Sequence, residues 1–257
     1  LLWGCIPTKS IVFSAEIWDH LKHADRYGID VAEQKLNWKG LLARKDDVIT
    51  RHTKGLDFLM KKNKITTFKG YGRLTGAAKD GIHTIDIKLA DGKTQAVKAK
   101  NVVLATGSDA RMLPGYKADE TIMTNYEILK TDHMPKSLVV IGSGAVGVEF
   151  ASVFKSFGAE VTILEMLPRV VPVEDEEISK ELLRLYKKRG IDVNLSIKDT
   201  KIEKNKDGAL VSFTDSNGKP QSKQAEKVLV AVGRAPRTYD IGLDKTKIVP
   251  DRGFIIT

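Results

Sequence analysis

The stretch LVVIGSGAVGVEF, residues 138–150, decides the fold. Its first four residues, Leu138 to Ile141, are apolar and predict a buried strand. The next six, Gly142 to Gly147, fit the pattern G-x-G-x-x-G and open a helix predicted over 145–157. A second predicted strand ends at Glu165, about 20 residues beyond the first glycine. Strand, glycine turn, helix and strand in this order predict a dinucleotide-binding βαβ unit.

Each glycine has a separate physical role in such a unit. Gly142 permits the tight turn, Gly144 lets the backbone approach a pyrophosphate, and Gly147 lets the helix pack on the strand. The phosphates would lie at the helix N-terminus, where free N–H groups favour anions. Glu165 would accept hydrogen bonds from ribose hydroxyls and repel a 2′-phosphate, which favours NAD, although nearby Arg169 leaves NADP open. A glycine-rich turn without a ligand is the alternative.

The rest of the chain supports an α/β class. After residue 137, a predicted helix over 174–190 and strands at 160–165, 191–195 and 227–233 continue the alternation, with an antiparallel pair at 199–204 and 209–214. Before it we predict helices over 7–27 and 37–62 and a hairpin turn at Asp91-Gly92. We also predict a buried strand over 102–105 that runs into a turn at Thr106-Gly107. The segment 131–137 is a predicted domain boundary.

Composition limits the classes of function. The chain has 257 residues, 42% hydrophobic and 29% charged, which allows two domains with cores. No apolar run approaches the ~20 residues that span a bilayer, so we expect no membrane partner. The net charge of +9 comes from scattered lysines without a zinc, helix-turn-helix or RNA-recognition pattern, so we expect no nucleic acid. One cysteine and no signal peptide favour a reducing compartment.

Two residues stay ambiguous on local grounds. Cys5 is either a small buried hydrophobe or a reactive thiol, because a helix N-terminus near Pro7 and the cation of Lys9 favour a thiolate. Glu149 lies in the first turns of an apolar helix. It either compensates the helix dipole or pairs with a buried cation, and its spacing favours neither.

Five segments in order resemble one family. They are WGCIPTKS (3–10), ATGSDAR (105–111), IGSGAVGVEFASVF (141–154), VTILEMLPRVVPVEDEEIS (161–179) and VGRAPR (232–237). Together they resemble the pyridine nucleotide-disulfide oxidoreductases, and within them the dihydrolipoamide dehydrogenase group. The resemblance implies two Rossmann-like FAD/NAD(P)-binding domains, the first incomplete. Residues 1–134 would be part of the FAD-binding domain, 135–237 the NAD-binding domain, and 238–257 the start of a return to the FAD/central domain.

The resemblance also assigns roles to residues. Cys5 would be the flavin-proximal thiol of a redox disulfide, whose partner would lie five positions earlier, upstream of Leu1, so the sequence is expected to be an interior fragment. Lys9 would lie near flavin N5 and form a buried ion pair with Glu149, which completes a catalytic set of Cys5, Lys9 and Glu149. The implied FAD contacts are Lys9, Gly72, Thr106, Gly107 and Ser108. The implied NAD contacts are Gly142, Ser143, Gly144, Ala145, Val146, Gly147, Glu149, Glu165 and Gly233.

The implied reaction oxidises protein-bound dihydrolipoamide through the disulfide and FAD and reduces NAD+ to NADH. The implied partners are a lipoyl domain of a 2-oxoacid dehydrogenase acyltransferase subunit and a second copy in a homodimer. A cytoplasmic location is expected, with the mitochondrial matrix as the alternative. Mercuric or glutathione reductase activity is a second possibility, and a non-catalytic NAD-binding module is a third. For this chain alone we expect no lipoamide turnover and no tight FAD retention.

Overall fold

The computed structural model describes residues 2–257, which form two compact units. Unit 1 comprises the chain up to Lys54 together with Ala110–Gly233, and unit 2 comprises Gly55–Asp109 with Arg234–Thr257. Each unit is a set of residues that contact one another within this chain. The boundaries expected at 134 and 237 refer to cofactor-binding domains, and they stay a prediction.

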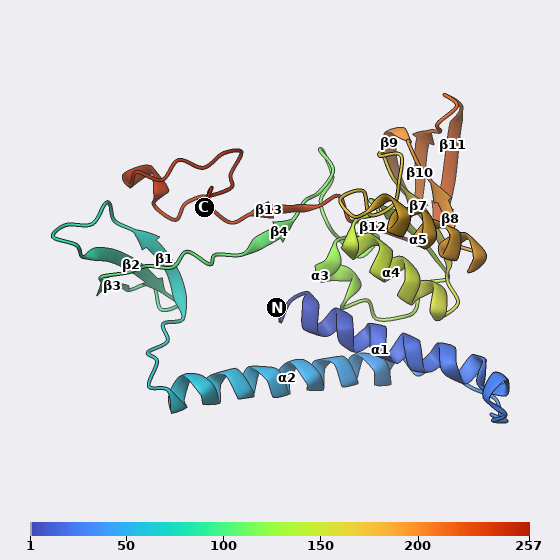
Figure 1. Ribbon diagram of the computed structural model, residues 1–257, viewed down its shortest axis with the longest axis horizontal. Coiled ribbons are helices and arrows are strands. Elements are labelled where there is room, and N and C mark those ends of the chain that lie inside the picture. Colours follow the sequence, from blue (N-terminus) through green and yellow to red (C-terminus); the bar gives the residue numbers. More distant parts are fainter. Residues whose placement is uncertain (1) are drawn as a thin grey trace. The chain divides into compact units, whose positions relative to one another are not determined.

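A five-stranded parallel sheet forms the centre of unit 1. Its order is β5 (Ile122–Met123), β12 (Lys227–Val230), β6 (Ser137–Ile141), β7 (Glu160–Leu164) and β8 (Asp192–Asn194). Helix α4 (Ala145–Ser156) joins β6 to β7, and α5 (Glu176–Lys188) joins β7 to β8 (Figure 1). The α/β class and each of these elements from β6 to β8 are confirmed.

The sheet is buried on both faces, because different layers cover them. Leu138 and Val140 of β6 belong to the core shared with α4, whereas Val139 and Ile141 belong to a second core. That second core includes the antiparallel strands β9 (Lys198–Asn205), β10 (Gly208–Thr214) and β11 (Pro220–Ala225). Strands covered on both faces are continuously apolar, as this stretch of sequence is. The pair β9–β10 is confirmed, and β11 is an additional strand that the polar sequence PQSKQA did not reveal.

Two long helices complete unit 1 on the α4 side of the sheet. Helix α1 (Cys5–Lys22) continues into a 3₁₀ turn, η1 (Ala24–Tyr27), that ends at Gly28 in the left-handed region, with φ of 69°. Helix α2 (Trp38–Lys62) begins in unit 1 and runs opposite to α1 (Figure 1). Ile11 and Trp38 pack in the same core as α4. The short helix α3 (Asn125–Ile128) begins at a capping box formed by Thr124 and Glu127.

Unit 2 is built on an antiparallel sheet of β1 (Gly70–Leu74), β2 (His83–Leu89) and β3 (Thr94–Ala99). The predicted turn at Asp91-Gly92 joins β2 to β3, and Gly92 has φ of 84°. Strand β4 (Ser108–Ala110) pairs with β13 (Arg234–Pro236), and a 3₁₀ turn, η2 (Leu243–Lys245), follows. The small core of this unit gathers Leu74, Ile241 and Leu243.

The predicted strand over 102–105 is wrong. This segment has no regular structure, and Val103 is 88% exposed. A strand requires a neighbour for its backbone hydrogen bonds. No strand within residues 2–257 pairs with this segment, so its apolar pattern alone does not produce one.

No helix between residues 2 and 257 combines the length and the apolar character needed to cross a membrane.

Candidate functional site

The glycine turn after β6 has the close contacts that its pattern predicts. Gly142 has φ of 99°, and a Cβ placed on it would lie 2.5 Å from the carbonyl oxygen of Ala231. A Cβ on Gly147 would lie 2.0 Å from the carbonyl oxygen of Gly142. A Cβ on Gly144, by contrast, would meet nothing within 4 Å and would project into open space. Gly142 and Gly147 are therefore required by packing, whereas Gly144 leaves room beside the backbone for a ligand.

The N-terminus of α4 completes this cradle. Gly144 is the N-cap and offers no side-chain acceptor to the first turn. The N–H groups of Ala145 and Val146 belong to that turn, where helical N–H groups have no partner within the helix. Free N–H groups and the helix dipole favour an anion at this place. The cradle therefore fits a dinucleotide pyrophosphate.

Glu165 follows β7 at the same edge of the sheet and is only 7% exposed. Its Oε2 accepts hydrogen bonds from the backbone N–H of Ser143 at 2.7 Å and from the Ser143 hydroxyl at 2.8 Å. Its Oε1 accepts one from the N–H of Leu167 at 2.8 Å. A carboxylate has about four acceptor positions, so one remains for a ribose hydroxyl. The ribose contact stays a prediction. The guanidinium of Arg169 donates to the carbonyl of Pro172, with Nη2 at 2.8 Å.

Cys5 is the first residue of α1 and is exposed. The alternative of a small buried hydrophobe is therefore wrong, and the thiol lies at the N-terminal end of α1. A cavity of about 320 Å³ opens beside it. Its lining includes Cys5, Lys9, Ser10, Phe13, Arg44 and His52.

Lys9 lies one turn further along α1 and forms an ion pair with Oε1 of Glu149 on α4. The pairing expected from the resemblance is present, but the expected burial is wrong. The Lys9 side chain is 62% exposed and that of Glu149 36% exposed, because no other segment of residues 2–257 covers them. The pair connects the thiol helix to the helix of the glycine turn, although the roles of both residues stay predictions.

The other candidate flavin residues lie in unit 2. Gly107 has φ of 78°, and its carbonyl accepts a hydrogen bond from the N–H of Arg237 at 2.9 Å. Arg234 Nε donates to the hydroxyl of Ser108 at 2.7 Å. Gly72 lies in β1 and Thr106 beside Gly107, both exposed. The structure gives this turn a geometry, and the flavin contacts of its residues stay predictions.

Gly233, a predicted NAD contact, ends unit 1. Its φ is 107°, and its carbonyl accepts a hydrogen bond from the N–H of Arg111 at 3.0 Å. A Cβ on Gly233 would meet nothing within 4 Å. The NAD contact stays a prediction.

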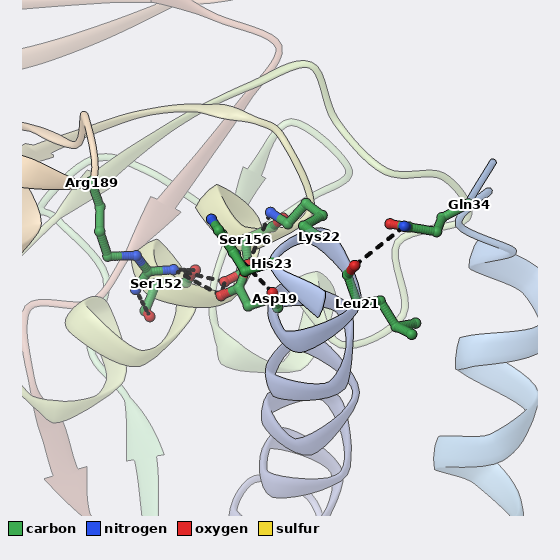
Figure 2. Close-up of polar contacts among 8 residues, drawn as sticks. All are labelled: Asp19, Leu21, Lys22, His23, Gln34, Ser152, Ser156 and Arg189. Carbon is green, nitrogen blue, oxygen red and sulfur yellow. Dashed lines mark hydrogen bonds and ion pairs between the residues drawn. The ribbon is translucent and has the colours of Figure 1, made fainter. Parts of the chain in front are cut away.

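A cluster that the sequence did not indicate joins the C-terminal ends of α1, α4 and α5. Arg189, at the end of α5, donates to the hydroxyl of Ser156 at 2.7 Å and to that of Ser152 at 2.6 Å (Figure 2). The same guanidinium lies 3.4 Å from Oδ2 of Asp19. Burial raises the pKa of Asp19, but hydrogen bonds from Ser156 and Lys22 and the charges of Lys22 and Arg189 hold that pKa below its usual value. The carboxyl therefore stays ionised at neutral pH.

Comparison with known proteins decides the family. Residues 1–257 match the family described as pyridine nucleotide-disulphide oxidoreductase. The chain belongs to this family. The chain is 38% identical over 255 residues to a dihydrolipoyl dehydrogenase of Cupriavidus necator, which covers 98% of the chain and 52% of that relative. It is 39% identical to a dihydrolipoamide dehydrogenase of Chaetomium thermophilum, covering 98% and 50%.

A solved structure agrees with this placement in the oxidoreductase family. LpdA from Mycobacterium tuberculosis superposes with a TM-score of 0.87 at 25% identity, over 98% of the chain and 54% of that structure. The chain thus spans about half the length of the curated relatives it matches.

Proposed function

We propose that this chain is part of an FAD-dependent dihydrolipoyl dehydrogenase, which oxidises protein-bound dihydrolipoamide and reduces NAD+ to NADH. One observation carries the proposal: Cys5 begins α1, and the Lys9–Glu149 pair connects α1 to the helix of the glycine turn. A thiol and a dinucleotide cradle joined in one unit are two of the parts that a disulfide oxidoreductase needs. The relatives that support the choice of substrate are named dihydrolipoyl dehydrogenase.

The reaction balances as a two-electron oxidation of a dithiol. The two substrate sulfurs would form a disulfide and release two protons and two electrons, and a disulfide between Cys5 and a second cysteine of the whole protein would take them up and open to two thiols. Cys5 would supply a sulfur at the N-terminus of α1, and Lys9 would supply a cation one turn further along the same helix. When bound, FAD and NAD+ supply the two-electron chemistry. Gly144 and the first turn of α4 would hold the NAD pyrophosphate, and Glu165 its ribose.

The partners follow from the same proposal. The dithiol would be carried by a lipoyl domain of a 2-oxoacid dehydrogenase acyltransferase subunit, and the enzyme would act as a homodimer. We place it in the cytoplasm or, alternatively, in the mitochondrial matrix.

Two other functions predict different results. A glutathione reductase would require NADPH, and the buried Glu165 disfavours a 2′-phosphate by charge repulsion. A mercuric reductase would reduce Hg(II), and a dinucleotide-binding module would transfer no electrons.

A substrate panel on the natural polypeptide that contains this chain distinguishes these functions. NADH formation from NAD+ is followed with dihydrolipoamide, and NAD(P)H consumption is followed with oxidised glutathione and with Hg(II). We expect turnover with dihydrolipoamide that Cys5→Ser abolishes. Turnover only with glutathione disulfide or Hg(II), or activity unchanged in Cys5→Ser, would contradict the proposal.

A further inference from the structure

Helices α1 and α4 run in the same direction and are joined at two places. Lys9 of α1 pairs with Glu149 near the start of α4, and Asp19 of α1 accepts a hydrogen bond from Ser156 at its end. At 1.5 Å per residue, Lys9 and Asp19 lie about 15 Å apart along α1. Both N-termini, with Cys5 and with the glycine turn, therefore lie at the same end of the pair (Figure 1).

Between these two places the helices pack through one buried core, to which Ala15 of α1 and Ala151 and Val153 of α4 belong. A groove of about 420 Å³ lies beside this contact, and its lining includes Glu16 of α1 and Ser152 of α4. Asp19 and Glu149 both contribute to its walls. The polar contacts at the two ends add to this apolar packing in aligning α1 against α4.

The two ends differ in strength. The Lys9–Glu149 pair is largely exposed, and exposed ion pairs contribute little to stability. At the other end Ser156 is only 4% exposed, and its hydroxyl contacts both Asp19 and Arg189. Lys22 pairs with Oδ1 of Asp19 at 2.9 Å and donates to the carbonyl of Ser156 at 2.7 Å (Figure 2). The better-connected end is therefore the one distant from the thiol.

We propose that Asp19, Ser156 and Arg189, hereafter the helix clamp, are positioning residues that hold Lys9 of α1 opposite Glu149 of α4. The helix clamp touches neither Cys5 nor the glycine turn, and it acts through the orientation of α1. Without it, α1 loses the polar contacts that hold its C-terminal end on α4, and the exposed Lys9–Glu149 pair changes its geometry. The charge next to Cys5 changes as a result. This inference rests on the proposed function only in treating that pair as part of the thiol site.

A double-mutant cycle on the chain itself tests the helix clamp. Cys5 is the only cysteine, so the rate of iodoacetamide alkylation at pH 7 reports on this one thiol. The rate is measured in the unchanged chain, in Asp19→Asn, in Glu149→Gln and in the double variant. If Asp19 acts through the pair, Asp19→Asn changes the rate by about twofold or more when Glu149 is present and leaves it unchanged when Glu149 is already Gln.

The control is Asp47→Asn, the same substitution in the exposed Asp47–Arg51 pair of α2, and it should not change the rate. Thermal unfolding verifies that each variant is folded, and Arg189→Lys replaces Asp19→Asn in the cycle if the latter is not. A rate change of the same factor in both backgrounds would show a merely structural role and overturn the proposal. No change in either background would also overturn it. The assay needs no flavin, NAD or lipoamide, so failure of the substrate panel does not affect it.

Discussion

Lys9 is the only lysine among the residues that line the cavity beside Cys5, and it lies one turn along the same helix. A cation beside a cysteine in general favours the thiolate, which is the form that reacts with alkylating agents. We therefore predict that Lys9→Met slows iodoacetamide alkylation of Cys5 at pH 7 by about threefold. Lys180→Met, in an exposed pair on α5, is the matched control and should leave the rate unchanged. An unchanged rate in Lys9→Met would show that Lys9 does not act on this thiol.

His133 joins the loop before β6 to the start of β12. Its ring contacts Glu226 on one nitrogen and Asp132 on the other. The hydrogen bond to Glu226, followed by that to Asp132, raises the pKa of His133 above 6.5. Because its pKa is higher in the folded state, protonated His133 stabilises the fold. This stabilisation is fully present below pH 6.5 and is lost as pH rises through the pKa of the folded state.

Urea unfolding measures the stabilisation that protonated His133 provides. We predict that His133→Gln lowers the free energy of unfolding at pH 5.5 and that the difference from the unchanged chain shrinks at pH 9. Half of the His133 side chain is exposed, so solvent screening keeps the effect small. A difference independent of pH would exclude this electrostatic origin.

At the scale of elements, Gly142 and Gly147 allow close packing in the turn, whereas Gly144 leaves room for a ligand. A methyl group on Gly147 would approach the carbonyl oxygen of Gly142 to 2.0 Å, which the backbone of β6 and α4 cannot relieve locally. We predict that Gly147→Ala lowers the free energy of unfolding by about 3 kcal/mol, the upper range for overpacked sites. Urea unfolding is measured for Gly147→Ala and for Gly158→Ala. At Gly158 no atom lies within 4 Å but φ is 105°, so the comparison separates the close contact from backbone strain. A loss no larger than in Gly158→Ala would contradict the packing role.

The sequence predicted the elements whose pattern is local. β6, α4, β7 and α5 followed from apolar runs, a glycine turn and charges at the helix ends, all read within a short window. β11 was missed because PQSKQA is polar and becomes a strand only by pairing with β10. The strand predicted over 102–105 is wrong for the opposite reason, since an apolar run without a neighbouring strand stays irregular. Pairing is tertiary information, which periodicity does not contain.

In the molecule as a whole, some residues of the candidate site lie in sequence motifs, whereas others come together only when the chain folds. The glycine turn, Glu165 and Cys5 were found because each lies within a recognisable pattern. Asp19 and Arg189 were not, because they are 170 positions apart and neither belongs to a motif. The exposure of the Lys9–Glu149 pair was also unpredictable, since burial depends on which segments cover α1 and α4.

The central claim is that unit 1 carries a pyridine-nucleotide cradle at the N-terminus of α4. Calorimetric titration of NAD+ into this chain tests it directly, with Gly144→Ser as the matched variant. Gly144 has the extended backbone typical of an N-cap, so Ser fits there and its hydroxyl occupies the N–H groups that the pyrophosphate needs. We expect weak binding at millimolar NAD+, weaker binding of NADP+, and loss of binding in a Gly144→Ser chain that is at least as stable. No heat at millimolar NAD+, or equal binding by Gly144→Ser, would contradict it.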